Sequence, residues 1–414
     1  MYLSSTYVSS TGPRRRLRVG GVPATVFALG LVSFFTDVSA EMVAAFLPMY
    51  VMYGLGAGLL QLGLLDGLYT GASALLRVAG GHLADRWSRP KAVALCGYGL
   101  SALSKLAFPL AGGALGGIGA AIAVDRAGKG LRAAPRDALI TAATPPRLLG
   151  AAFGVHRALD TAGALLGPIA VFALVGAVGD AYDAVFVVSF CLALVGIVIL
   201  AAFVRNHPIR PAVPAEAHLP GRQAARAGAG VREGLRLLAE RPLRRVTLFA
   251  SLLGLATAGD AILFVAVQRQ AGLPASALPL LPLATSLVFL AAAVPLGRLA
   301  DKVGGWRIFL MGHAFLALSY LFVAHPGTAA AALLLHGLFY ASTDGVLMAH
   351  LAGMLPAHLR ATGLAVTQTG QALARMAGAI GFGFLATGLD LRWCFLICAT
   401  LLLSTLLAAW RSGT

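Results

Sequence analysis

Two related stretches of the sequence decide the fold: GHLADRWSRPK at residues 81–91 and GRLADKVGGWR at residues 297–307. Each follows a long apolar run, and the second begins 216 residues after the first. A further pair, PRLLGAA from Pro146 and PAHLRAT from Pro356, is related at an offset of 210 residues. Matching segments half a chain apart indicate that two structurally similar halves make up the protein.

The composition around these stretches is that of a membrane protein. The 414 residues are 58% hydrophobic and 12% charged, and the mean hydropathy is +0.83. Soluble domains carry roughly 25% charged residues, so a water-soluble, disordered or disulfide-rich secreted protein is excluded. Since a spanning helix needs about 20 apolar residues, the chain is long enough for twelve spans with short loops.

Apolar runs between polar breaks predict an all-α membrane protein with twelve transmembrane helices in two six-helix bundles. The first bundle covers residues 22–204 and the second covers residues 243–410. They are joined by a linker at 205–242 that is rich in Pro and Arg, and flanked by tails at 1–21 and 411–414. The predicted spans are 22–53, 57–81, 91–112, 115–143, 147–177, 182–204, 243–267, 276–297, 308–324, 327–355, 360–388 and 393–410.

The net charge of +16 follows the predicted topology. Of the 32 Lys and Arg residues, 22 fall on one side of the predicted membrane and only Arg269 and Arg392 on the other. Basic residues accumulate on the cytoplasmic side of membrane proteins, so both termini are expected in the cytoplasm. The basic excess therefore does not call for a nucleic-acid partner, and we expect a multi-pass protein of the cell (inner) membrane.

The sequence carries no sign of enzymatic chemistry. It has no P-loop, no catalytic-triad order and no metal-ligand spacing, and Cys96, Cys191, Cys394 and Cys398 all fall in predicted spans. We interpret these cysteines as packing residues and expect neither a cofactor nor a metal.

The repeated loop resembles a known signature. Residues 81–91 are similar to the loop G-x-L-A-D-R-x-G-R-[KR] between spans 2 and 3 of the major facilitator superfamily, although Ser88 replaces the second Gly and Pro90 shifts the last basic residue. The resemblance implies a secondary transporter whose two bundles rock around a site near the membrane midplane. It assigns a gating role to Gly81, Asp85, Arg86, Arg89, Lys91, Gly297 and Asp301.

Ionisable residues inside spans are costly and indicate function. Ser33, Asp37 and Glu41 share one helix face, where mutual repulsion of the two carboxylates favours protonation of at least one. The stretch AEMVAAFLP from Ala40 resembles the first span of proton-coupled drug antiporters. The predicted proton-coupling residues are Asp37, Glu41, Arg126, Asp160 and His156. For each of them a structural ion pair or hydrogen bond is the alternative.

Span 4, which contains VDRAGKGLRAAPRDALI, is unusually charged. Asp125 and Lys129 can pair along the helix, and Pro135 is expected to kink or break it. Near this span, five acids (Asp37, Glu41, Asp125, Asp137, Asp160) face five bases (Arg126, Lys129, Arg132, Arg136, Arg157). Candidates for substrate binding are Lys129, Arg132, Arg136, Asp260, His336, Tyr340, Asp344, Gln368, Gln371 and Arg375. Helix packing is the alternative for the set in the second half.

Span 5 carries a helix-packing motif. Gly163, Gly167 and Pro168 resemble the G-x-x-x-G-P signature of antiporters in the superfamily, without its trailing glycines. Glycines at this spacing let two helices approach closely.

Together these patterns predict a monomeric transporter that uses protons to export a small organic compound by alternating access. The alternative is an importer or exchanger of a small anionic metabolite that binds the basic stripe of span 4. A membrane sensor without transport activity is a third hypothesis, which the intact loop motifs argue against.

Overall fold

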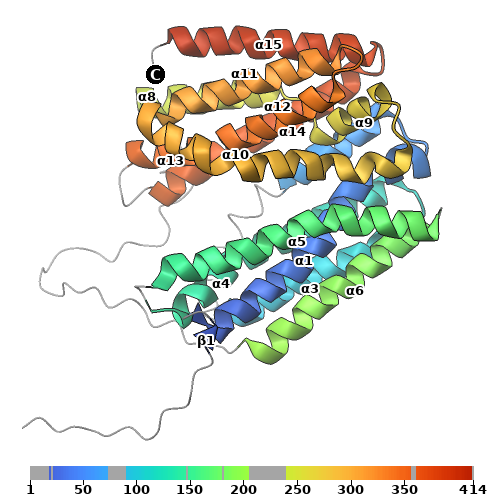
Figure 1. The fold of residues 1–414 in the computed structure, drawn as a ribbon, viewed down its shortest axis with the longest axis vertical. Helices are drawn as coiled ribbons and strands as arrows, with labels where there is room; N and C mark the ends of the chain where they lie inside the picture. Colours follow the sequence, from blue (N-terminus) through green and yellow to red (C-terminus); the bar gives the residue numbers. More distant parts are fainter. Residues whose placement is uncertain are drawn as a thin grey trace, which may run out of the picture.

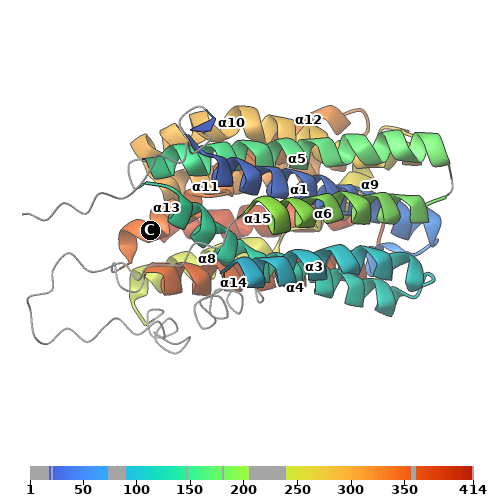
Figure 2. The ribbon, with the colours of Figure 1, turned by 90° about the horizontal axis from the view of Figure 1, so that it is seen from below.

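The computed structural model describes residues 18–19, 22–72, 90–145, 148–179, 181–204, 239–355 and 360–412. Nearly all of them are helical. The exception with regular structure is a short antiparallel pair of two-residue strands, β1 (Arg18–Val19) and β2 (Val22–Pro23), which precedes the first helix. Figure 2 shows that the long helices of both halves run in nearly the same direction.

The first half forms one bundle. Its helix α1 (Ala24–Met49) continues into a π-helical turn, η1 (Tyr50–Gly54), and α1 packs against both α5 and α6. The other helices are residues 59–72, α3 (Pro90–Leu110), α4 (Leu115–Ala143), α5 (Leu149–Val178) and α6 (Asp183–Phe203).

The glycines of α5 explain how closely it packs on α1. A Cβ at Gly163 would lie 2.4 Å from the carbonyl oxygen of Phe34, and one at Gly167 would lie 2.7 Å from Cβ of Glu41. The predicted packing role of these two glycines is therefore seen in the geometry. Gly167 also places α5 directly against a predicted proton-coupling residue.

The second half forms the other bundle (Figure 1). Its helices are α8 (Arg241–Leu255), α9 (Asp260–Gln270), the 3₁₀ turn η3 (Ala275–Leu280), α10 (Leu281–Val303), α11 (Gly305–Val323), α12 (Ala329–Thr343), α13 (Val346–Met354), α14 (Arg360–Leu385) and α15 (Leu391–Arg411). Helix α8 begins two residues before the end of the predicted linker, and residues 205–238 of that linker lie outside the described part of the chain.

Two predicted spans are broken helices. Span 7 is divided between α8 and α9 by residues 256–259, and span 10 is divided between α12 and α13 at Asp344 and Gly345. Gly345 has φ 78°, a left-handed conformation that favours glycine. Of the expected kink or break at Pro135, a break does not occur, since α4 (Leu115–Ala143) continues through that residue.

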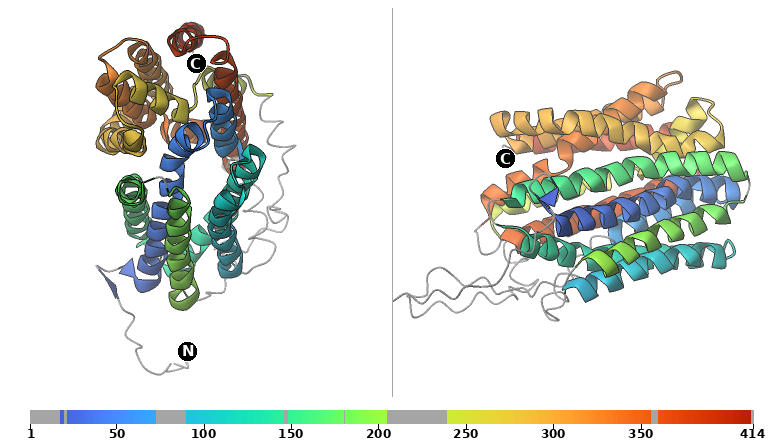
Figure 3. Two further views of the ribbon diagram at one scale, coloured as in Figure 1. Left: turned by 90° about the vertical axis from the view of Figure 1, so that its right-hand side faces the viewer. Right: turned by 60° about the horizontal axis from the view of Figure 1, so that its bottom comes forward.

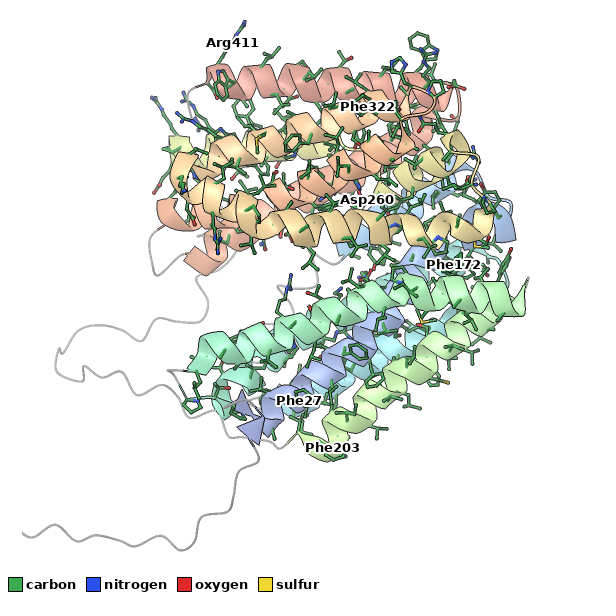
Figure 4. The ribbon with its side chains drawn as sticks, in the orientation of Figure 1. Phe27, Phe172, Phe203, Asp260, Phe322 and Arg411 are labelled. Atoms are coloured by element: carbon green, nitrogen blue, oxygen red, sulfur yellow. The ribbon has the colours of Figure 1, made fainter. Side chains whose placement is uncertain are left out.

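The surface of the bundles is that of a membrane protein. Nine helical segments within the described residues are long and apolar enough to span a bilayer. Large apolar side chains point outward, such as Leu110 (84% exposed) and Phe203 (69% exposed), the latter at the outer edge of its bundle in Figure 4. In contrast, Asp125, Arg126 and Arg132 of α4 are buried, so these three charges of the helix are inside the bundle.

The two bundles converge toward one end. Figure 1 shows α5 and α10 approaching each other toward the end that carries η1 and η3 and diverging toward the opposite end. Residues 59–72 cross to the second bundle, where a Cβ at Gly63 would lie 2.7 Å from the carbonyl oxygen of Ala379 in α14. Figure 3 shows this segment, in lighter blue, beside the second bundle.

Candidate functional site

A buried cluster of charges joins α3 to α4. The carboxylate of Asp125 accepts hydrogen bonds from Lys105 (2.5 Å), from Ser101 (2.6 Å) and from the guanidinium of Arg126. Lys105 is 2% exposed and Arg126 is 3% exposed. The predicted pairing of Asp125 with Lys129 along α4 is therefore wrong, since partners on α3 and the neighbouring residue occupy the carboxylate.

The guanidinium of Arg126 is held on two sides. Besides Asp125, it lies over the ring of Tyr69, 3.9 Å from the ring centroid. Such stacking stabilises a desolvated cation by about 2 kcal/mol. Arg126, a predicted proton-coupling residue, is thus anchored between α4 and residues 59–72.

Asp37 is the point where α1, α4 and α5 meet. Its carboxylate lies 3.7 Å from the guanidinium of Arg132, which also stacks on the ring of Tyr98 at 4.5 Å. Asp160 adds a second acid near Asp37, and Lys129 adds a nearby positive charge. Arg132 is thus the member of the basic stripe that lies directly beside an acid of span 1.

Asp160 extends this network along α5. Arg136 and Arg157 lie 3.8 Å and 3.5 Å from its two carboxylate oxygens. Arg136 also donates a 3.0 Å hydrogen bond to Asp137. Both basic residues are thereby compensated by acids of the first bundle.

Glu41 lies one helical turn beyond Asp37. Its nearest charges include Lys129, Asp37 and Arg126, yet within the described residues neither Glu41 nor Lys129 makes a hydrogen bond or ion pair. Glu41 and Lys129 are therefore the two charged members of this cluster without a direct partner among the described residues.

His156 is engaged differently from the acids. Its Nε2 lies 2.8 Å from the hydroxyl of Ser33, and its ring is 4% exposed. The geometry matches the alternative considered from the sequence, a hydrogen-bonded histidine between α1 and α5.

The second bundle has its own polar cluster at the start of α9. Asp260 accepts a hydrogen bond from Tyr340, and it lies 3.4 Å from Nε2 of His336 and 3.8 Å from Arg375. Arg375 donates a 2.8 Å hydrogen bond to the hydroxyl oxygen of Tyr340. Four of the predicted substrate-binding residues are thus brought together from α9, α12 and α14.

This cluster opens into a cavity of about 270 Å³ between α9, α10 and α12. Within the described chain, the carboxylate of Asp344 makes no hydrogen bond or ion pair. Gln368 and Gln371, two further candidates, do not line the cavity. The lining residues are Asp260, Phe264, Pro282, Thr285, Ser286, Phe289, Tyr340 and Asp344.

Asp66 connects the two bundles. From residues 59–72 its carboxylate faces the backbone N–H groups of Asp260 and Ala261 at the first turn of α9. A Cβ on Gly259 would lie 2.2 Å from its Oδ2. A carboxylate stabilises a helix N-terminus. The N-terminus of α9 is available to Asp66 because span 7 is broken at residues 256–259.

Further contacts fasten the converging end. Tyr53 of η1 donates a 2.6 Å hydrogen bond to the side-chain oxygen of Gln268 in α9. The backbone N–H of Ala258 donates to the hydroxyl of Tyr320 at 2.8 Å, which holds the broken segment against α11.

The loop candidates are only partly placed. Four of them lie outside the described residues: Gly81, Asp85, Arg86 and Arg89. Lys91 donates a 2.8 Å hydrogen bond to a backbone carbonyl of α6. Asp301 is exposed near the end of α10. The predicted balance of five acids and five bases near span 4 omitted Lys105. A lysine in a predicted span was the signal available for it.

The comparison with protein families decides the identity. The model of the Major Facilitator Superfamily matches residues 29–379 and 261–413. The chain belongs to this superfamily. It is accordingly a transporter and not an enzyme, and a multi-pass protein of the cell membrane; the predicted fold class is confirmed.

Individual relatives extend this assignment. An uncharacterized MFS-type transporter of Methanocaldococcus jannaschii is 26% identical over 87% of this chain and 88% of its own. An uncharacterized protein of Mycobacterium tuberculosis is 36% identical over 38% of each chain. Among solved structures, the nucleoside transporter NupG has a TM-score of 0.76 at 12% identity, covering 94% of this chain and 98% of its own. A POT family transporter in complex with a thioalcohol-conjugated peptide has a TM-score of 0.73 at 16% identity, covering 94% and 96%. These two structures share the fold.

Proposed function

We propose that this protein is a proton-coupled exporter of a small organic compound. The observation that carries the proposal is the position of Asp37 and Glu41 one turn apart in α1, next to Asp160 and Lys129. Asp37 and Asp160 have arginines beside them, whereas Glu41 has no direct cationic partner among the described residues, and a buried carboxylate without such a partner is costly to keep ionised. Protonation of Asp37 or Glu41 would leave the positive charge of Arg132 or Lys129 without its neighbouring negative charge. The contacts between α1, α4 and α5 would change as a result.

The cavity supports a neutral or cationic substrate. The arginines of the span-4 stripe already have acidic neighbours, Arg132 with Asp37 and Arg136 with Asp137 and Asp160. The cavity itself is in the second bundle and is lined by Asp260 and Asp344 beside aromatic rings. Aromatic faces attract cations, and because Asp260 already has Arg375 beside it, Asp344 is the carboxylate that would attract a cation and repel an anionic metabolite.

An anionic substrate remains the second candidate because of Lys129. It lies near Asp37 and Glu41 without a direct ion pair among the described residues. When either acid is protonated, this cation becomes available to a carboxylate or phosphate group.

The mechanism follows from the two-bundle arrangement. We propose from the distribution of basic residues that the diverging end of the bundles faces the cytoplasm, which would make this conformation open inward. Opening to the outside requires separation of the converging end, and with it loss of the Tyr53–Gln268 hydrogen bond and of the Asp66 contact with α9.

Purified protein in liposomes with an internal pH-sensitive dye tests the proposal. Amines, neutral aromatic compounds and carboxylates are added one at a time, and coupled transport appears as substrate-dependent proton flux. We expect Asp37→Asn or Glu41→Gln to abolish the flux while substrate-for-substrate exchange continues. Asp390→Asn, at the exposed start of α15, is the matched control. Unchanged flux in both variants and in their combination would remove α1 from the proton path, and flux with carboxylates alone would favour the second candidate.

A further inference from the structure

An apolar groove lies on the outer face of the second bundle, far from the charge clusters. It is formed between α11 and α15, with a volume of about 290 Å³, and apolar atoms make up nearly all of its surface. Its walls include Leu310, Met311, Leu403 and Leu407, and Arg307 and Trp410 also line it. The cavity proposed for the substrate shares none of these residues.

The groove ends in a zone of positive charge. Arg307 is in the first turn of α11 and Trp410 in the last turn of α15, so both belong to the same end of the bundle. Figure 1 shows the beginnings of α8 and α11 and the end of α15 together at this end, and Figure 4 shows Arg411 directed away from the bundle. Five arginines are exposed there and make no ion pair with any described side chain: Arg241, Arg244, Arg245, Arg307 and Arg411.

This arrangement matches the chemistry of one kind of molecule. An apolar slot along the helices accommodates an acyl chain, while an arginine and a tryptophan at its end lie where lipid headgroups begin, as is typical of membrane interfaces. Guanidinium groups bind phosphate by paired hydrogen bonds. A zwitterionic headgroup carries its own cation and would be less favoured beside five arginines that have no ion pair among the described residues.

We propose that the groove between α11 and α15 is a binding site for an anionic phospholipid, with one acyl chain in the groove and the phosphate at Arg307. The lipid would come from the surrounding membrane leaflet. A second copy of this chain packing through α15 is a competing outcome of the test.

Native mass spectrometry of the purified protein in detergent tests the site. Phosphatidylglycerol is added and compared with phosphatidylcholine of the same acyl chains. We expect phosphatidylglycerol to bind more tightly, and Arg307→Gln to weaken its binding about fivefold, the effect of one basic residue at an anionic surface. Ala314 is exposed in the groove, so Ala314→Trp should fill the slot and weaken binding of both lipids with every arginine retained.

Arg298→Gln is the matched control, because Arg298 is an exposed basic residue of α10 outside the groove. It should leave lipid binding unchanged. Equal binding of the two lipids would overturn the proposal, as would an equal effect of Arg298→Gln and Arg307→Gln or unchanged binding after Ala314→Trp. A lipid-free dimer that Ala314→Trp dissociates would assign the groove to a second copy instead.

Discussion

Replacing Asp125 by Asn should destabilise the protein more than the loss of any exposed acid. The substitution keeps the shape of the side chain and removes its charge. Lys105 and Arg126, which are 2% and 3% exposed, then lose the carboxylate that neutralises both. Removing one partner of a buried ion pair costs about 3–5 kcal/mol, because the remaining charge stays buried and unpaired.

The structure divides this cost between the two cations. Arg126 retains its contact with the ring of Tyr69 at 3.9 Å, whereas Lys105 retains only neutral acceptors, which are the backbone carbonyl and hydroxyl of Ser101 and the side-chain oxygen of the new Asn. We therefore expect the larger part of the penalty to arise from Lys105. The double variant Lys105→Met with Asp125→Asn should recover at least half of the lost free energy of unfolding.

Unfolding in bilayer-like micelles by increasing fractions of a denaturing detergent measures these free energies. Asp390→Asn is the control. It removes a charge from an exposed helix start, while the side-chain oxygen of Asn can still accept from the N–H of Arg392, so its cost should be well below about 1 kcal/mol because Asn and Asp cap helices about equally well. If Asp125→Asn costs no more than this control, or if Lys105→Met makes the Asn variant still less stable, the reasoning about a buried charge cluster is refuted.

Three other substitutions probe helix packing and the bundle interface. Gly163→Leu should unfold or displace α5, since even a Cβ there would lie 2.4 Å from a carbonyl oxygen of α1, while Gly176→Leu, with open space around it, should leave the melting temperature nearly unchanged. Tyr53→Phe removes the hydrogen bond between η1 and α9, worth about 0.5–1.5 kcal/mol; spin-label distances across the bundles should show the outward-open population rising roughly two- to tenfold, and a constant population would contradict a gating role. Gly259→Ala should push the bundles apart because its Cβ would lie 2.2 Å from the carboxylate of Asp66, so transport should fall, and normal transport would show that this contact is dispensable.

Much of the architecture was accessible from the sequence because it depends on local properties. Apolar runs of the length of a bilayer predicted the spans, and Asp260, His336, Tyr340 and Arg375 were candidates because polar residues inside spans indicate function, before the structure brought them together. The spacing of Gly163 and Gly167 likewise predicted a close helix contact, since one helix face can be read from the sequence of one helix.

Contacts between helices had to come from the tertiary structure. Lys105 and Asp125 are twenty residues apart on different helices, and nothing in either helix alone indicates that they would pair in preference to Asp125 and Lys129. The breaks at residues 256–259 and at Asp344 occur within apolar runs that the sequence predicts as continuous spans. A helix can break there because distant side chains such as Tyr320 form hydrogen bonds with the freed backbone groups, and these partners cannot be identified from the sequence of the span. The contact of Asp66 with α9 requires two features of the tertiary structure. Span 7 must be broken so that α9 begins inside the bundle, and residues 59–72 of the other bundle must lie close enough for Asp66 to reach that helix start.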